Sequence, residues 1–166
     1  MSITNLEDLF QHDLRDTLDA EKQILKALPK MAKACTSDEL RAAFEEHKAQ
    51  TEKQVERLES IFESLGKAAR GKHCHGMEGL VKEGDEIIKE NEPSAALDAA
   101  LIGAAQKIEH YEIAAYGTLA TYAKMLGNEE ALSLLLETLD EEKMTDEKLT
   151  GLASEINLVA EEQPAK

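Results

Sequence analysis

Four stretches of this sequence place apolar residues at helical spacing, and each stretch has a polar side chain within its apolar face. In the first stretch, Glu21 lies three residues after Leu18 and four residues before Leu25. The corresponding polar residues of all four stretches are Glu21, Gln54, Glu112 and Glu142. Carboxylates that converge in an apolar core need protons, hydrogen-bond donors or a metal cation. The pattern therefore indicates a buried metal site.

The polar positions lie at matching distances from the turns of two expected helical hairpins, which are centred on Thr36 and Gly127. Fifteen residues from a turn lie Glu21, Thr51, Glu112 and Glu142, and one helical turn farther along lie Gln54 and Asp146. At about 1.5 Å of rise per residue, all of these residues lie roughly 22 to 29 Å from their turn. The two hairpins thus form a pseudo-repeat, and antiparallel packing would bring the polar side chains to one level of a bundle.

Caps and glycines set the expected limits of the elements. Thr4 with Glu7, and Thr36 with Glu39, form capping-box patterns that open the first two helices. A glycine-rich stretch then indicates a crossover, Pro93 with Ser94 indicates the start of the third long helix, and Asn128 is expected to cap the fourth. We expect long helices over 5–34, 37–66, 94–127 and 128–157, and a short helix over 81–89. The predicted fold is all-α: a four-helix bundle of two hairpins over 1–158, joined by a long crossover that contains a short helix, with a polar C-terminal tail over 159–166.

Composition narrows the class of protein. The 166 residues favour one domain, and the formal net charge of -15 disfavours binding to nucleic acid or to anionic membranes. The start lacks the basic cluster and the apolar run of a secretory signal, and no segment has the roughly 18 apolar residues of a membrane span. Two cysteines do not make a disulfide framework. We expect a cytoplasmic protein with reduced thiols.

Several stretches together resemble the YciE/YciF-type ferritin-like stress proteins of bacteria. They are DTLDAEKQILKAL (16–28), His47 through Thr51 to QVERL (54–58), CHGMEGL (74–80), DAALIGAAQKIEHYEIAAYGTLA (98–120) and ETLDEEKMTDEKLTGLA (137–153). The resemblance covers nearly the whole domain. It implies a ferritin-like bundle, a homodimer, and a metal site related to the di-iron centres of rubrerythrin-like proteins. The implied ligands are Glu21, Gln54, Glu112, Glu142 and Asp146, with Glu109 and His47 as nearby candidates.

The sequence departs from the wider ferritin-like pattern, which has one glutamate on each of two helices and Glu-x-x-His on each of the other two. Thr51 and Gln54 occupy one such motif here, and Glu142 and Thr145 occupy the other, so both histidines are missing. A site of carboxylates and an amide should accept manganese, iron(II), magnesium or calcium, and should hold iron more weakly than a histidine-containing centre. The missing histidines argue against fast oxygen chemistry without excluding a reaction with oxygen or peroxide, and a mononuclear or substoichiometric site is an alternative to a dinuclear one.

Other interpretations of these polar side chains remain possible. The carboxylates could form a hydrogen-bond network between helices, with protons in place of a metal. His47 lies about 10 Å of helix rise from Gln54, which favours a hydrogen bond in a neighbouring core layer. His110 points about 160° away from Glu112 and is expected at the surface or at a dimer face.

The remaining chemical side chains are assigned to the loop or to packing. His73, Cys74 and His75 could bind zinc or copper, but three adjacent residues do not easily converge on one ion, so we expect loop residues. Tyr111, Tyr116 and Tyr122 could place a phenol near a redox metal, but we expect packing residues with solvated hydroxyls.

Two functions follow from these expectations. The first is a ferritin-like stress-response protein with an iron or manganese centre, mononuclear or dinuclear, that could react with oxygen or peroxide. The second is a non-catalytic dimeric stress protein that acts through surface interactions, with a structural metal or none. The sequence contains no nucleophile elbow and no phosphate-binding glycine loop, which argues against hydrolases and nucleotide enzymes.

Overall fold

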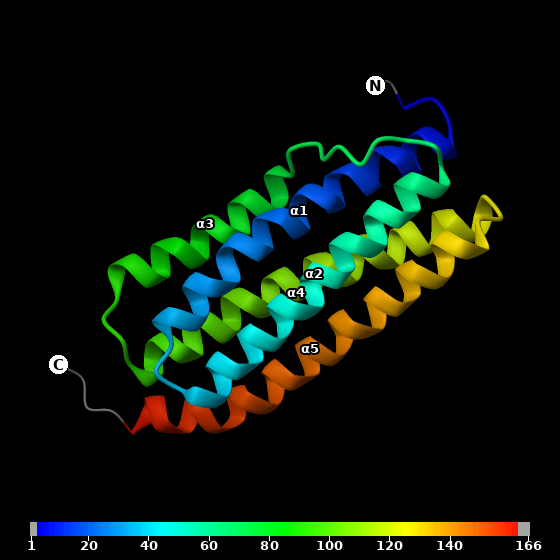
Figure 1. Cartoon of the computed structure of the whole chain (residues 1–166). Helices are drawn as coiled ribbons and strands as arrows, with labels where there is room; N and C mark the ends of the chain where they lie inside the picture. Colours follow the sequence, from blue (N-terminus) through cyan, green and yellow to red (C-terminus); the bar gives the residue numbers. More distant parts are fainter. Residues whose placement is uncertain (1–2, 163–166) are drawn as a thin grey trace.

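The computed structural model describes residues 3–162, and the described part of the chain is an elongated bundle of helices without strands (Figure 1). Two antiparallel hairpins pack against each other, and a long crossover with a short helix joins them, so the predicted fold is confirmed. Within these residues, none of the helices has the length and apolar character that a membrane span requires. The helices are α1 (Leu6–Ala34), α2 (Asp38–Ser64), α3 (His75–Glu90), α4 (Ala95–Met125) and α5 (Glu129–Glu161).

Each helix begins at a side chain that accepts a backbone N–H from its first turn. Ser94 and Asn128 are the predicted caps of α4 and α5. The first two caps lie one residue later than predicted, at Asn5 and Ser37, because these side chains reach the orphan amides of Asp8 and Leu40. The turns after α2 and α4 use glycines with φ of +65° and +68°, a conformation that favours glycine.

Two helices are longer than the sequence pattern indicated. α3 begins at His75 rather than near Val81, because the Sγ atom of Cys74 accepts the N–H of Met77 as a cap. α5 continues past Asn157 to Glu161, so the first residues of the predicted tail are helical. Glu162 follows as the C-cap, and residues 163–166 of the tail lie outside the described residues.

The turn between α1 and α2 is anchored to the start of α4. Asp98 is buried, and its two carboxylate oxygens accept the backbone N–H groups of Thr36 and Ser37 at 2.8 and 2.9 Å. The hydroxyl of Thr36 donates a third hydrogen bond at 2.6 Å. Thr36 therefore acts as an anchor between hairpins, and this contact fixes their relative position along the bundle.

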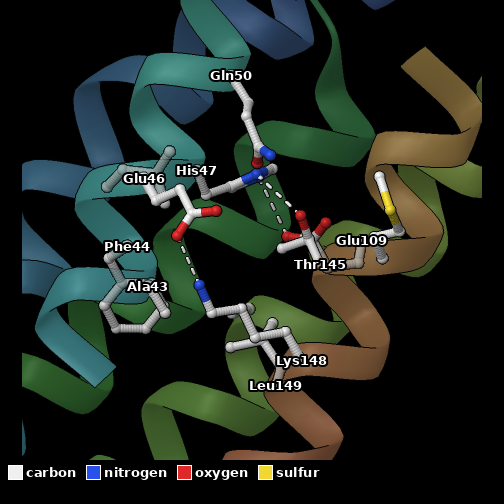
Figure 2. A pocket seen from close by; sticks show the side chains of 12 residues that line it. Ala43, Phe44, Glu46, His47, Gln50, Glu109, Thr145, Lys148 and Leu149 are labelled. Carbon is white, nitrogen blue, oxygen red and sulfur yellow. Dashed lines mark hydrogen bonds and ion pairs between the residues drawn. The ribbon is translucent and has the colours of Figure 1, made fainter. Parts of the chain in front are cut away.

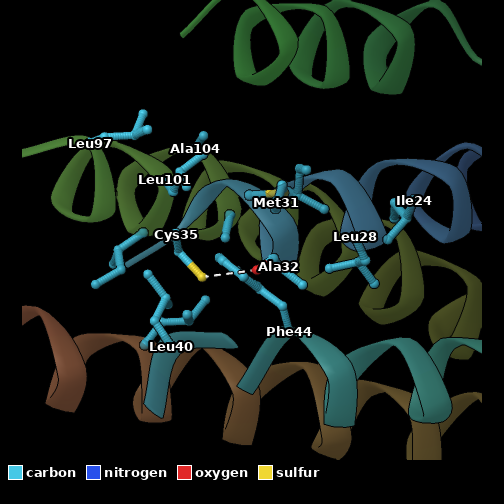
Figure 3. Packing of buried hydrophobic residues seen from close by; sticks show 14 of the residues in the cluster. Ile24, Leu28, Met31, Ala32, Cys35, Leu40, Phe44, Leu97, Leu101 and Ala104 are labelled. Carbon is cyan, nitrogen blue, oxygen red and sulfur yellow. Dashed lines mark hydrogen bonds between the residues drawn. The ribbon is translucent and has the colours of Figure 1, made fainter. Parts of the chain in front are cut away.

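The hydrophobic core has two parts. One cluster fills the end near the α1–α2 turn and includes Leu28, Leu40, Phe44 and Leu101 (Figure 3). The other fills the opposite end. Between the two clusters, along all four bundle helices, lies a buried set of six polar residues that we call the polar layer: Glu21, His47, Gln54, Glu109, Glu112 and Glu142. The bundle thus holds a polar centre between two apolar ends.

Candidate metal centre

Glu21, Gln54, Glu112 and Glu142 come from α1, α2, α4 and α5, and all four side chains are buried. Gln54 Nε2 donates a hydrogen bond to Glu142 Oε1. The charge of Glu142 also raises the pKa of Glu21 and of Glu112, because these carboxyl groups lie near it. The four residues that were aligned by counting from the turns therefore lie near one level in the middle of the bundle. Of the three carboxylates, Glu112 and Glu142 belong to the group whose ligand atoms lie within 4.8 Å of one another, whereas Glu21 does not.

The site extends along the bundle axis to Glu109 and His47. One ligand atom from each of His47, Glu109, Glu112 and Glu142 lies within 4.8 Å of the other three. His47 Nε2 is 3.3 Å from Glu109 Oε1. His47 lies one level away from Gln54, as predicted, and Glu109, one helical turn before Glu112, connects the two levels. The centre consequently includes one imidazole.

Asp146 and His110 lie at the margin of the centre. Asp146 accepts a hydrogen bond from Gln106 Nε2 at 3.2 Å, and its other carboxylate oxygen is 3.3 Å from His110 Nε2. The Asp146 side chain is 22% exposed, and it is not among the four residues whose ligand atoms converge. His110 is exposed, as predicted.

Tyr116 contradicts the prediction of a solvated hydroxyl. Its side chain is fully buried, and its hydroxyl donates a hydrogen bond to Glu21 Oε1. Burial raises the pKa of Tyr116 well above the usual value of a phenol, and the neighbouring Glu21 carboxylate adds to this effect. The phenol is thus a fixed hydrogen-bond donor to Glu21. The sequence carried a signal for this contact, since Tyr116 lies one turn after Glu112 on the same helix.

A second set of contacts holds Gln54 and α5 in place. Gln54 Nε2 also donates to Glu141 Oε2 at 3.0 Å, and Arg57 binds both oxygens of Glu141 at 2.7 Å. Arg57 further contacts Glu137 at 2.6 Å. Against the opposing effect of burial, the hydrogen bonds from Arg57 and Gln54 lower the pKa of Glu141. The guanidinium therefore neutralises the outer carboxylates and leaves those of the polar layer without a basic partner other than His47.

The electrostatics of the centre favour a proton or a cation on the carboxylates. Burial, and then the nearby Glu142, raise the pKa of Glu21 to about 8. The same two causes raise the pKa of Glu109 and of Glu112 well above the usual range of a carboxyl group. These shifts arise because several acidic groups share a site from which water is excluded.

The donor atoms fit a metal ion. Among the described residues, seven buried side-chain atoms have no hydrogen-bond partner, and all seven belong to the polar layer. Native proteins rarely leave such atoms unsatisfied, and each costs about 1–3 kcal/mol when it does. The atoms are Glu21 Oε2, His47 Nε2, Gln54 Oε1, Glu109 Oε2, both carboxylate oxygens of Glu112 and Glu142 Oε2. Six oxygens and one imidazole nitrogen form a hard, oxygen-rich set suited to iron(II) or manganese(II).

A pocket of about 130 Å³ leads from the surface between α2 and α5 towards this centre. Figure 2 shows His47 and Glu109 at its inner end, with Thr145 beside the imidazole at 3.5 Å. Glu46 and Lys148 form a 2.6 Å ion pair across its outer part. The pocket thus lies against the imidazole end of the polar layer, where His47 and Glu109 line it.

Comparison with known proteins places this chain in a family. Residues 5–162 match the family described as a domain of unknown function, DUF892. The chain belongs to this family. Over 164 residues it is 50% identical to protein YciF of Escherichia coli strain K12, and the match covers 97% of this chain and 98% of the relative. The predicted resemblance is confirmed.

Solved structures show the same architecture. The crystal structure of the E. coli stress protein YciF is similar with a TM-score of 0.89 and 48% identity, covering 93% of this chain and 98% of that chain. YcfI of Rhodopseudomonas palustris is similar with a TM-score of 0.87 and 44% identity, covering 90% and 95%. A two-domain protein of Anabaena variabilis with a ferritin-like domain matches with a TM-score of 0.70 and 17% identity, covering 98% of this chain and 41% of that chain. The fold is therefore ferritin-like.

Proposed function

We propose that this protein is a cytoplasmic, ferritin-like stress-response protein that binds iron or manganese in its polar layer and uses the bound metal to react with oxygen or peroxide. One observation carries the proposal: the unsatisfied buried polar atoms of the described chain all belong to the polar layer, and four of its residues offer ligand atoms within 4.8 Å of one another. A role in the stress response is supported by the 50% identity to YciF, a relative described as a stress protein.

The donor set supports this choice of metal. Carboxylate oxygens suit manganese and hard divalent ions, and an imidazole nitrogen suits iron. His47 therefore shifts the preference away from magnesium and calcium, which prefer oxygen ligands alone. When bound, iron or manganese would supply redox chemistry towards a small oxidant.

The chain's own residues hold the site ready for the ion. Glu112 and Glu142, from the two helices of the second hairpin, are the central ligands, and Glu109 with His47 completes the inner end. Gln54 orients Glu142 through its amide N–H and keeps its own Oε1 free to bind the ion. Rigid helices and the apolar clusters on either side fix the geometry and exclude bulk water.

Tyr116 and Thr145 act beside these ligands. The Tyr116 hydroxyl fixes one oxygen of Glu21 and leaves Glu21 Oε2 free. Thr145 Oγ1 donates to the carbonyl of Glu141 at 3.1 Å and lies next to His47. Thr145 stands where a second Glu-x-x-His motif would have its histidine, and it lines the pocket together with His47. A small oxidant can enter beside His47.

Metal analysis tests the proposal. We would purify the untagged protein without chelators and measure its metal content by elemental mass spectrometry, together with the isosteric variant Glu112→Gln/Glu142→Gln. Glu147→Gln is the matched control, because Glu147 is an exposed glutamate on the same helix as Glu142. Iron or manganese in the wild type and the control, and its loss in the double variant, is the expected result. Consumption of oxygen or peroxide by the iron-loaded protein should be lost with the metal.

Retention of full metal content by the double variant would refute the assignment of the ligands. A wild type that binds no iron or manganese, and whose thermal stability does not change when these metals are added, would favour the non-catalytic interaction protein. The homodimer is also part of the proposal, and light scattering on a sizing column tests it. A large closed shell would instead indicate iron storage of the ferritin type.

A further inference from the structure

A second group of metal-binding side chains lies on the surface, where the crossover enters α3. His73, His75 and Glu78 each offer one ligand atom, and these atoms all lie within 4.8 Å of one another. Glu78 Oε2 is 3.0 Å from His73 Nε2 and 3.4 Å from His75 Nδ1. All three side chains are at least half exposed, and none belongs to the polar layer.

Local backbone geometry brings the two imidazoles together. Cys74, between them, has an extended conformation with φ of -89° and ψ of 100°. Side chains two residues apart in extended backbone point to the same side, whereas the one between them points to the other side. Cys74 is accordingly buried, with its thiol against the Tyr111 hydroxyl at 2.9 Å, and the two histidine rings face solvent with their centroids 4.6 Å apart.

The early start of α3 adds the third ligand. Because the helix begins at His75, Glu78 lies three residues into it and shares a face with His75. The sequence predicted that three adjacent residues would not converge on one ion, and Cys74 indeed points inward, away from the two imidazoles. His73 and His75 nevertheless come together, and Glu78 from the first turn of α3 joins them.

Neighbouring contacts hold this segment in position. Asp19 Oδ2 accepts the backbone N–H of Cys74 at 2.8 Å, and Gln23 Nε2 donates to the carbonyl of Cys74 at 3.1 Å. The same Asp19 oxygen lies 3.6 Å from His73 Nδ1 and adds negative charge beside the group. Lys72 does not oppose this charge at close range, because its ammonium group contacts His12 at 2.9 Å.

We propose that His73, His75 and Glu78 form a surface site for a divalent transition-metal ion of the zinc(II) and copper(II) class. Two imidazole nitrogens and one carboxylate oxygen suit these ions, in contrast to the oxygen-rich polar layer. Three protein ligands on an exposed surface leave coordination positions for water, so the ion is exchangeable. Copper(II) binds more tightly than zinc(II) in sites of this kind. The ion joins the end of the crossover to the first turn of α3.

Titration with zinc and copper salts tests the site. The parent for these titrations is the Glu112→Gln/Glu142→Gln protein, which retains the surface group, and the test variant adds His73→Asn and His75→Asn. Equilibrium dialysis should show one ion bound to the parent and affinity weakened by at least about 10- to 100-fold in the test variant. The control His110→Asn, which removes an exposed imidazole outside the group, should leave the affinity unchanged. Equal affinities in the parent and the test variant would overturn the proposal.

Copper(II) coordination in the wild type provides a second measurement that does not depend on the parent variant. Electron paramagnetic resonance with less than one equivalent of copper should show splitting from two imidazole nitrogens, and His75→Asn should reduce this to one. The polar layer contains a single imidazole, His47, and cannot give the two-nitrogen pattern. A one-nitrogen spectrum that is unchanged in His75→Asn would overturn the proposal. Circular dichroism checks that the exposed substitutions leave the fold intact.

Discussion

Replacement of Glu21 with glutamine should make the metal-free protein less sensitive to rising pH. Glu21 has a folded-state pKa of about 8 because of burial and of Glu142, against an ordinary value of 4.5. Between these two values the folded state holds a proton that the unfolded state has lost, so the free energy of unfolding falls as pH rises. At about 1.4 kcal/mol per pKa unit, the interval corresponds to about 5 kcal/mol. Whole domains are stable by about 5–15 kcal/mol, so the effect is large.

Glutamine preserves the shape of the side chain and the acceptor oxygen for the Tyr116 hydroxyl, but it has no proton to lose. The assay is urea unfolding of chelator-treated protein, followed by circular dichroism, at pH values spanning 4.5 to about 8. Over this range we expect the wild type to lose up to about 5 kcal/mol more stability than Glu21→Gln. Glu45→Gln, at an exposed position on α2, should follow the wild type.

Parallel stability profiles for the wild type and Glu21→Gln would refute this reasoning, because they would show that Glu21 titrates alike in the folded and unfolded states. Added manganese provides a further check. It should raise the stability of the wild type most at the upper end of the range, where the carboxylates must otherwise repel one another, and should raise that of Glu21→Gln less.

Two further predictions concern the hairpin anchor and the pocket. Asp98→Ala should lower the free energy of unfolding by about 3 kcal/mol, because the N–H groups of Thr36 and Ser37 lose a charged acceptor, and urea titration measures this loss. An effect below about 0.5 kcal/mol, the range of ordinary surface substitutions, would contradict the anchoring role. Ala43→Leu should slow the uptake of manganese by the metal-free protein without changing its final metal content, since Ala43 lines the pocket beside His47. Stopped-flow mixing measures the rate, and an unchanged rate would mean that ions enter elsewhere.

The sequence predicted the main helices and the level of four site residues because both follow from regular geometry. Helical spacing and turn positions fix where Glu21 and Glu112 lie along the axis, and they require no knowledge of side-chain packing. The caps Asn5 and Ser37 were missed by one residue, because neighbouring polar residues compete for the same amides and only the final backbone geometry selects one of them.

Side-chain reach explains the other differences. His47 was placed in a separate layer on helix rise alone, but its long side chain and that of Glu109 close the gap between the two levels. Asp146 lies near the correct level, yet contacts from Gln106 and His110 hold it at the margin. Cys74 is an unusual helix cap, so the predicted start of α3 was too late, and His75 was expected in the loop although it is the first residue of the helix.

The division of the core into two apolar clusters has a consequence for how an ion enters and leaves. Each cluster contains residues of all four bundle helices on its own side of the centre. Apolar packing therefore holds the helices together at both ends of the bundle, and the middle is polar. A local fluctuation that separates the helices in the middle of the bundle breaks the contacts of the polar layer, while the apolar contacts at both ends remain. An ion bound as proposed would then exchange through local opening, without unfolding of the whole chain.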